Sequence, residues 1–383
     1  MVNKVALSVL VIFLLSPSII TLETSPVPEK ATRLNRVIAR YDEFVEQTLQ
    51  EYGVPGAAIA IVDHGEVVYL KGFGVRELGR PEMITPHTVF RIASLSKGFA
   101  AVLTGLLVQD GILNWDDRVT KYLPDFSLRD LHHAHALTIR HILSHTSGLP
   151  AHAYDNLLDA RVPFDAIVEQ LKNAPILFPA GKLYAYQNVV YSLIGPVIES
   201  ATGKEYPYLL RKRLLIPLAM HDASLSYEEL LADTNRATPH IRRRHQWMPM
   251  GIKNTYYSVL PAAGINASIF DMAQWLRALL GGMPAIVPPE IVQQITEPLI
   301  RTPREKRRLN WNGHVRDAYY GLGWRILDYE GMKLIFHSGG VRGYRAQIAF
   351  IPEEKVGIVV LLNAEVANHF ASAFFDMYLG GIE

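Results

Sequence analysis

The chain has 383 residues, of which 49% are hydrophobic and 20% charged, so it can bury a substantial core and we expect two packed subdomains. Its formal net charge of +1 gives no reason to expect a nucleic-acid partner, because binding phosphates needs a strongly basic face. The absence of cysteine excludes disulfides, a lipid-modified cysteine and thiolate metal ligands.

The first residues, 1–25, predict a signal peptide or an uncleaved signal anchor. Lys4 supplies the positive start, Val5 to Leu15 is apolar apart from one serine, and the small residues at 16–18 suit cleavage. Further apolar residues extend this stretch, so residues 5–22 are also long enough for an anchor. We therefore expect an exported protein, periplasmic or extracellular, that contacts a membrane only through this segment and only if it is not removed.

The folded part opens with an expected helix from Ala31 to Glu51. Two strands follow, over 57–62 and 67–70, and the turn sequence Asp63-His64-Gly65-Glu66 between them predicts a hairpin. Residues 88–93 are typical of a strand that leads into a buried apolar helix.

The middle of the chain is expected to be mainly helical, and the C-terminal part returns to strands. Helices are expected over 137–143, 164–172, 189–202, 206–215 and 269–280. Strands are expected over 323–327, 333–336, 344–350 and 356–362, and a last helix over 366–378. Strands at both ends with helices between them predict an α+β fold: one antiparallel sheet flanked by N- and C-terminal helices, with an inserted helical subdomain.

Ser94-Leu95-Ser96-Lys97 is the only place where a lysine follows a serine at the third position. If Ser94 opens a helix, Lys97 lies one turn away on the same face, and the helix N-terminus directs free N–H groups at the same spot. A serine hydroxyl becomes a nucleophile when a neighbouring base takes its proton, and burial can lower a lysine pKa enough for that task. Taken alone, the pattern fits an N-cap serine beside an unrelated surface lysine equally well.

Two later segments offer the other groups that acyl transfer needs. Tyr186-x-Asn188 precedes an expected helix, where Tyr186 could shuttle a proton if Lys97 stabilises its phenolate and Asn188 could bridge Lys97 and a substrate carbonyl. Phe336-His337-Ser338-Gly339-Gly340 ends an expected strand, and its glycines suit a backbone that approaches substrate closely and donates an N–H to an oxyanion. A core aromatic beside a helix cap, and a plain strand-to-turn junction, are the alternative interpretations.

In this order and at these separations, Ser94-x-x-Lys97, Tyr186-x-Asn188 and His337-Ser338-Gly339 resemble the three motifs of the penicillin-recognising serine hydrolases. The resemblance is specifically to the class C β-lactamase branch, which also holds D-alanyl-D-alanine carboxypeptidases, D-aminopeptidases and esterases. It extends from about residue 35 to the C-terminus and is supported by residues 54–58, 140–149, 217–220 and 320–324.

This resemblance implies one β-lactamase-like domain over residues 31–383, with the fold of β-lactamases and penicillin-binding-protein transpeptidases. The sheet subdomain would comprise residues 31–93 and 318–383, and the helical subdomain residues 94–317. The active site would lie in the cleft between the two subdomains.

The resemblance also implies a role for each motif residue. Ser94 would be acylated, Lys97 and Tyr186 would exchange protons with it, and Asn188 would orient the substrate amide. The backbone N–H groups of Ser94 and Gly340 would form the oxyanion hole.

The third motif departs from true class C β-lactamases, which carry lysine where His337 stands. Imidazole attracts a β-lactam carboxylate less firmly than a permanent ammonium does, so we expect peptidase or esterase chemistry rather than efficient antibiotic hydrolysis. The strand that contacts the substrate would still include His337, Ser338, Gly339 and Gly340. Arg342 could supply the missing positive charge, or could be a surface arginine.

No metal or other cofactor is predicted. His133-x-His135 lacks the Asp-His that follows in zinc β-lactamases, no H-E-x-x-H occurs, and the absence of G-x-S-x-G argues against an α/β-hydrolase. Two functions remain. One is an exported serine hydrolase that acts through a covalent acyl-enzyme on a small-molecule or peptide substrate, whether a β-lactam, a D-amino-acid peptide or an ester. The other is a penicillin-binding sensor or scaffold of the same fold without turnover.

Overall fold

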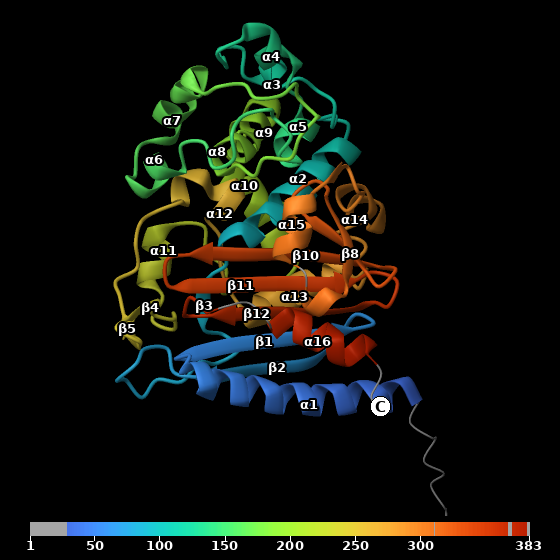
Figure 1. Ribbon diagram of the computed structural model, residues 1–383. Coiled ribbons are helices and arrows are strands. Elements are labelled where there is room, and N and C mark those ends of the chain that lie inside the picture. Colours follow the sequence, from blue (N-terminus) through green and yellow to red (C-terminus); the bar gives the residue numbers. More distant parts are fainter. Residues whose placement is uncertain (1–28, 310, 367–369, 381–383) are drawn as a thin grey trace, which may run out of the picture.

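The computed structural model describes residues 29–309, 311–366 and 370–380 (Figure 1). The predicted signal segment, residues 1–25, lies outside the described residues. An eight-stranded antiparallel sheet forms the centre, in the strand order β2-β1-β12-β11-β10-β9-β8-β7. This architecture confirms the α+β prediction of one antiparallel sheet with helices on its faces.

Both ends of the chain build this sheet. Its N-terminal elements are α1 (Glu29–Tyr52), β1 (Gly56–Asp63) and β2 (Glu66–Gly74). Its C-terminal elements are β8 (Val315–Tyr320), β9 (Arg325–Tyr329), β10 (Met332–Val341), β11 (Tyr344–Ile351), β12 (Val356–Leu362) and the helix α16 (Phe370–Leu379). The two sets join where β1 pairs with β12, with Ala57 opposite Leu362 and Asp63 opposite Val356.

The sheet separates two hydrophobic cores. Side chains alternate between the faces of a strand, so Val360 packs toward α1 and α16 while Val359 packs toward α13 (Ile269–Leu279). All of β12 is buried, which explains why its sequence is an uninterrupted apolar run rather than an alternating one. The sheet therefore has no solvent-exposed face along its central strand.

The part between the terminal strands is mainly helical; the segment from α2 to α10 lies above the sheet in Figure 1, whereas α13 packs against the sheet. Its α-helices are α2 (Ser96–Gln109), α3 (Val119–Tyr122), α4 (Leu131–Ala136), α5 (Ile139–Leu143), α6 (Asp155–Asp159), α7 (Phe164–Gln170), α8 (Asn188–Ser192), α9 (Ile194–Thr202), α10 (Tyr206–Leu210), α11 (Tyr227–Ala232), α12 (Leu260–Ala263), α13, α14 (Pro289–Ile295) and α15 (Pro303–Arg308). The expected helix over 189–202 is two helices that meet at Leu193, and the expected helix over 206–215 continues from α10 into a π-helical turn.

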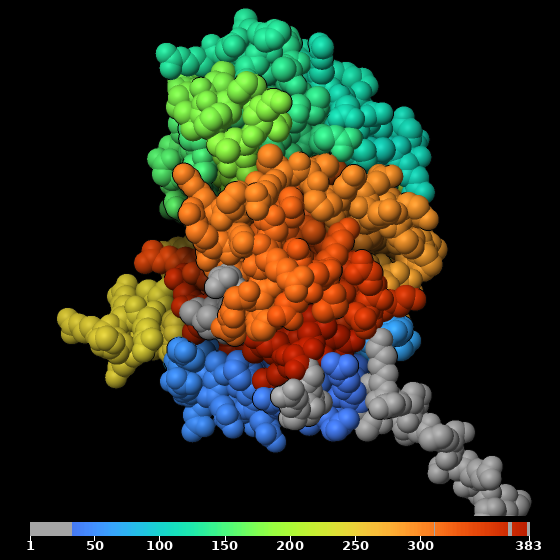
Figure 2. Space-filling model, turned by 45° about the vertical axis from the view of Figure 1, so that its right-hand side comes forward, coloured from blue at the N-terminus to red at the C-terminus, as the bar shows by residue number. Residues whose placement is uncertain are grey.

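Short strands complete the molecule. They are β3 (Val89–Arg91), which pairs with β6 (Asn266–Ser268), β4 (His240–Arg243), which pairs with β5 (Gln246–Pro249), and β7 (Ile300–Arg301) at the sheet edge. The sheet therefore includes residues before 318, the position at which the sequence predicted that the second part of the sheet subdomain would begin. Figure 2 shows the segment around β4 and β5, in yellow, projecting from the body of the molecule.

One close contact joins the sheet to the helical part. After β3 the chain forms the 3-10 turn η1 (Ala93–Leu95), and β10 packs directly against it. A Cβ on Gly339 of β10 would lie only 2.3 Å from the carbonyl oxygen of Ile92 and 3.0 Å from the nitrogen of Ser94. Only glycine permits this approach, which brings the end of β10 to the start of α2.

No helix in the described ranges combines the length and the apolar character that crossing a bilayer requires.

Candidate active site

Ser94 lies in the 3-10 turn η1, two residues before α2 begins at Ser96, rather than at the first position of the helix. The backbone of Ala93 just before it is left-handed, with a φ of 48°, a conformation that costs a non-glycine residue about 1–3 kcal/mol. The hydroxyl of Ser96 locks the turn: it donates to the carbonyl of Ala93 at 2.7 Å and accepts from the N–H of Ile265 at 3.1 Å. The turn therefore holds Ser94 in a fixed, strained position.

Lys97 is completely buried, and its amine lies 3.3 Å from the hydroxyl oxygen of Ser94. The same amine donates to Oδ1 of Asn188 at 2.8 Å and to the carbonyl of Ala262 at 3.0 Å. A neutral amine has two N–H donors and one lone pair. The protonated amine donates a third bond to Oγ of Ser94, whereas in the neutral amine Asn188 and Ala262 take both donors and the lone pair is left for the proton of Ser94.

Burial lowers the pKa of Lys97 well below its ordinary value of 10.5. Asp155 opposes this shift and the positive charge of Arg325 reinforces it, but both are smaller than the desolvation. The lowered pKa makes loss of a proton from this amine easier, so that Lys97 can act as a base toward Ser94.

Tyr186 lies over this amine, with Nζ of Lys97 4.6 Å from its ring centroid, and shares a hydrogen bond with Ser94. Burial raises the pKa of Tyr186 to about 12, and Arg325 and Ser94 offset only part of the rise. The raised pKa disfavours a phenolate at Tyr186, and the suggestion that Lys97 stabilises such a phenolate stays a prediction. Tyr186 is instead an O–H donor and acceptor beside the nucleophile.

Asn188, the first residue of α8, bridges Lys97 and Asp155. Its Oδ1 accepts from Lys97, and its Nδ2 donates to Oδ2 of Asp155 at 2.8 Å. The bond to Asp155 uses one of the two N–H groups of the amide, and the bridge from Asn188 to a substrate carbonyl stays a prediction. Asp155 fixes the amide so that its oxygen faces the lysine.

The third motif lies on the other side of Ser94, but its histidine is turned inward. His337 is 1% exposed, and its Nε2 lies 3.2 Å from both the hydroxyl of Tyr320 and Nη1 of Arg325. Its Nδ1 lies 2.9 Å from the carbonyl of Ser338, so Nδ1–H donates there and Nε2 accepts. Burial, together with Arg325 and Lys97, holds the pKa of His337 well below its ordinary value, so the imidazole is neutral.

Arg325 is a functional neighbour that the sequence reasoning missed. It is buried, pairs with Glu305 at 2.8 Å, and lies 5.4 Å from the ring centroid of Tyr186. Burial opposes its charge, but Tyr184 and Glu305 keep its pKa above the ordinary value. The available signal was a charged residue inside the expected strand 323–327, whose other members are apolar or glycine.

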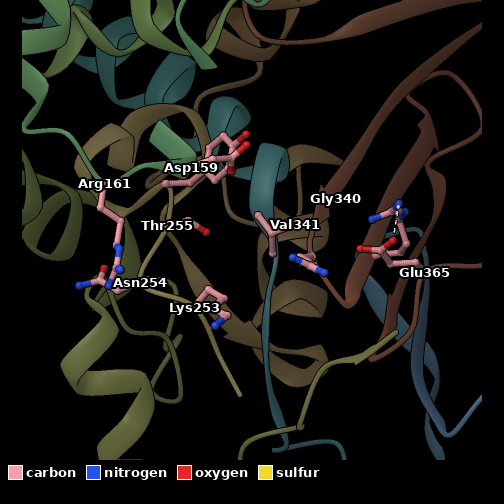
Figure 3. Close-up of a pocket in the computed structure, with 11 residues that line it drawn as sticks. Asp159, Arg161, Lys253, Asn254, Thr255, Gly340, Val341 and Glu365 are labelled. Carbon is pink, nitrogen blue, oxygen red and sulfur yellow. Dashed lines mark ion pairs between the residues drawn. The ribbon is translucent and has the colours of Figure 1, made fainter. Parts of the chain in front are cut away.

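The remaining motif residues line the open side of the site. Ser338 is half-buried, Gly340 is exposed, and β10 pairs with β9 only from Met332 to Phe336, which leaves its end free on that side within the described residues. Arg342 is exposed in the turn between β10 and β11 and is not in the group around Ser94. It lines a separate cavity of about 580 Å³ together with Gly340 (Figure 3).

Across the described ranges, no group of three His, Asp or Glu side chains is placed to hold a metal ion. His133 instead contacts the carbonyl of Ser147 through Nε2 at 2.6 Å.

A half-buried serine and a buried lysine beside the end of β10, with a tyrosine over the amine, define a serine hydrolase of the penicillin-recognising kind. A family model for Beta-lactamase matches residues 41–374, and the chain belongs to this family.

Its relatives share about a quarter of its residues. The chain is 28% identical over 350 residues to the unguisins hydrolase ungD' of Aspergillus campestris, covering 88% of this chain and 64% of that protein. It is 28% identical over 328 residues to Protein flp of Staphylococcus aureus strain N315, covering 84% and 62%. The chain thus spans less than two thirds of the length of these curated relatives.

A solved structure resembles the whole described fold. The octameric penicillin-binding protein homologue from Pyrococcus abyssi has a TM-score of 0.78 and 28% identity, covering 90% of this chain and 77% of that one.

We predict that Arg325→Met destabilises the protein by about 3 kcal/mol, because it leaves the carboxylate of Glu305 buried with only Arg308 as partner. Adding Glu305→Gln to Arg325→Met removes the second charge and should restore most of the loss. Urea unfolding followed by tryptophan fluorescence measures the free energy of unfolding of the single and the double variant. Arg301→Met, which breaks an exposed pair with Asp317, is the matched control and should leave stability nearly unchanged. A double variant as unstable as the single one would contradict this account.

Proposed function

We propose that the protein is a serine hydrolase that forms a covalent acyl-enzyme at Ser94 on amide, ester or β-lactam bonds. The observation that carries the proposal is the fully buried amine of Lys97, whose two N–H groups are engaged while Ser94 lies within reach of its lone pair. The relationship to an enzyme described as a hydrolase supports the same chemistry.

The proton follows a short route in this mechanism. Lys97 takes the proton of Ser94 as Oγ attacks the carbonyl carbon, and Tyr186 gives its own proton to the leaving group as the bond of that group to the carbon breaks. The Lys97 ammonium then returns a proton to the Tyr186 phenolate, which restores both groups. In the second half a water molecule gives a proton to Lys97 as it attacks the ester of Ser94, Tyr186 protonates Oγ as the acyl–oxygen bond breaks, and Lys97 again reprotonates Tyr186. The lowered pKa of Lys97 and the raised pKa of Tyr186 support these roles of base and acid.

The developing oxyanion would be bound by the backbone N–H groups of Ser94 and Gly340. Support comes from the packing of Gly339 against the nitrogen of Ser94, which places the end of β10 and the 3-10 turn side by side. Because β10 lacks a partner strand there within the described residues, a substrate can lie along its free side.

Within the family, we place the protein in the class C branch and expect peptides or esters as substrates rather than β-lactam antibiotics. His337 is neutral and donates to its own strand, so it offers no cation to a β-lactam carboxylate. The penicillin-binding sensor without turnover is the alternative, and the experiment below separates the two.

Protein lacking residues 1–25 should hydrolyse p-nitrophenyl esters with steady turnover, and Ser94→Ala should reduce the rate by about 10³-fold or more. Intact mass spectrometry of a slowly deacylating ester should show one acyl group on the wild type and none on the variant. A burst of one equivalent without turnover would favour the sensor. Unchanged hydrolysis by Ser94→Ala would remove this residue from the mechanism.

The pH profile tests Lys97 as the base. Only the neutral amine accepts a proton, so kcat/KM should rise with pH through the pKa of Lys97 and reach its plateau well below pH 10.5. Lys97→Arg keeps a cation that cannot lose its proton and should lower kcat/KM by about 10³-fold at every pH. Tyr186→Phe should lower the plateau without moving the rising limb. A rising limb that persists in Lys97→Arg would assign it to another group.

We further propose that the protein is exported through residues 1–25, on the strength of the positive start and the apolar run from Val5 to Leu15. N-terminal sequencing of the full chain expressed in a bacterium, after cell fractionation, tests this. We expect an exported form that begins after Ser18 or an intact form in the membrane fraction, and intact protein in the cytosol would oppose export.

A further inference from the structure

An unbroken line of hydrogen bonds leads from the surface of the protein to Lys97. Its outer member is His152, whose side chain is 59% exposed and whose Nδ1 lies 2.8 Å from Oδ2 of Asp155. The same Oδ2 accepts from Nδ2 of Asn188 at 2.8 Å, and Oδ1 of Asn188 accepts from Nζ of Lys97 at 2.8 Å. One amide therefore connects the carboxylate of Asp155 to the amine.

The backbone before α6 holds Asp155 against the second motif. The N–H of His152 donates to the carbonyl of Tyr186 at 2.7 Å. His152 and Tyr154 have φ values of 57° and 63°, which are left-handed and uncommon for residues other than glycine. Conformations of this kind cluster at functional sites, where the surrounding structure maintains them. They turn the chain so that Asp155, the first residue of α6, lies on the amide of Asn188.

The hydrogen bond from Asn188 to Asp155 decides which way round the amide lies. An ionised carboxylate only accepts hydrogen bonds, so the NH₂ group of Asn188 has to face Asp155 and its oxygen has to face Lys97. In the reversed orientation an N–H of Asn188 would point at the amine and compete with Ser94 for its lone pair. The bond to Asp155 therefore favours the arrangement in which Lys97 can accept the proton of Ser94.

The charge of the same carboxylate acts in the opposite direction. The side chain of Asp155 is 15% exposed, and its Oδ1 is buried with no hydrogen-bond partner in the part of the chain that the structure describes. Water therefore screens the charge only weakly. Burial lowers the pKa of Lys97 most, and the negative charge of Asp155 raises it because it favours the ammonium form.

Asp155 is the carboxylate among the charged and titratable groups that surround this amine. The other groups near Lys97 or Asp155 are a guanidinium, imidazoles and phenols: His145, His152, Tyr186, Tyr191, Tyr256, Arg325 and His337. We propose that Asp155 is a positioning residue with two opposed effects on Lys97: its hydrogen bond orients the amide beside the base, and its negative charge keeps the amine protonated to a higher pH. The inference rests on the proposed hydrolase function and adds to it a residue outside the three motifs.

Two substitutions separate these effects. Asp155→Asn keeps an oxygen acceptor for Asn188 and removes the charge, whereas Asp155→Ala removes both. In Asp155→Asn the rising limb of kcat/KM for a p-nitrophenyl ester should move to lower pH, so that the rate on its acidic side increases about threefold or more while the plateau changes less than about twofold. Asp155→Ala should displace the limb in the same direction but lower the plateau about tenfold, because the amide of Asn188 can then turn.

Asp165→Asn is the matched control, since Asp165 is an exposed aspartate in the first turn of α7. It should leave the limb and the plateau unchanged. A limb that stays in place in both Asp155 variants, whatever their plateaus, would overturn the charge effect. Equal plateaus in Asp155→Asn and Asp155→Ala would overturn the orienting bond. Either result, with Ser94→Ala still inactive, sinks the inference and leaves the hydrolase proposal standing.

An NMR titration measures the charge effect without turnover. In protein labelled with ¹³C at the Cε atoms of lysine, the signal of Lys97 is the one that Lys97→Arg removes, and its titration midpoint reports the protonation of the amine. Asp155→Asn should move this midpoint to lower pH, and Asp165→Asn should not. If no ester is hydrolysed but the midpoint moves, Asp155 acts on Lys97 and the hydrolase proposal fails. A midpoint that Asp155→Asn leaves in place overturns the inference whatever the activity.

Discussion

The burial of one amine governs the chemistry of this molecule. Lys97 lies at the start of α2 with no solvent contact, and two fixed acceptors take its N–H groups. Its depressed pKa and its hydrogen bonds have the same origin, because α8 and α12 supply the two acceptors around the amine and the rings of Tyr186 and Tyr191 lie close to it. The strained turn at Ala93 then keeps the serine hydroxyl facing that amine.

The third motif of this site presents no positive charge to solvent. Where the family's β-lactamases carry a lysine in the third motif, this chain has a neutral His337, and the nearest permanent cation is the buried Arg325 behind it. Arg325 is neutralised by Glu305 of α15, so it orients His337 and influences Tyr186 without presenting a charge to solvent. Exposed cations, Arg161, Lys253 and Arg342, line the separate cavity beside Gly340.

The sequence was informative wherever the relevant spacing is short or the pattern is periodic. The pairing of Ser94 with Lys97 follows from helix geometry, and the sheet strands follow from apolar runs and turns. The bond between Asn188 and Asp155, the ion pair of Arg325 and the left-handed Ala93 depend on how distant segments pack. No local spacing encodes such contacts, which is why the inward orientation of His337 had to come from the structure.

The union of β1 with β12 has a consequence for biogenesis. The ribosome synthesises the hairpin of β1 and β2 some three hundred residues before β12, the strand that pairs with β1. The nascent chain therefore cannot complete its central sheet until synthesis is almost finished. During that interval the inner edge of β1 has no native neighbour, and its apolar surface needs protection by a chaperone or by a secretion apparatus. Because of this long-range pairing, the central sheet is completed only after β12 has been synthesised, long after the nucleophile Ser94.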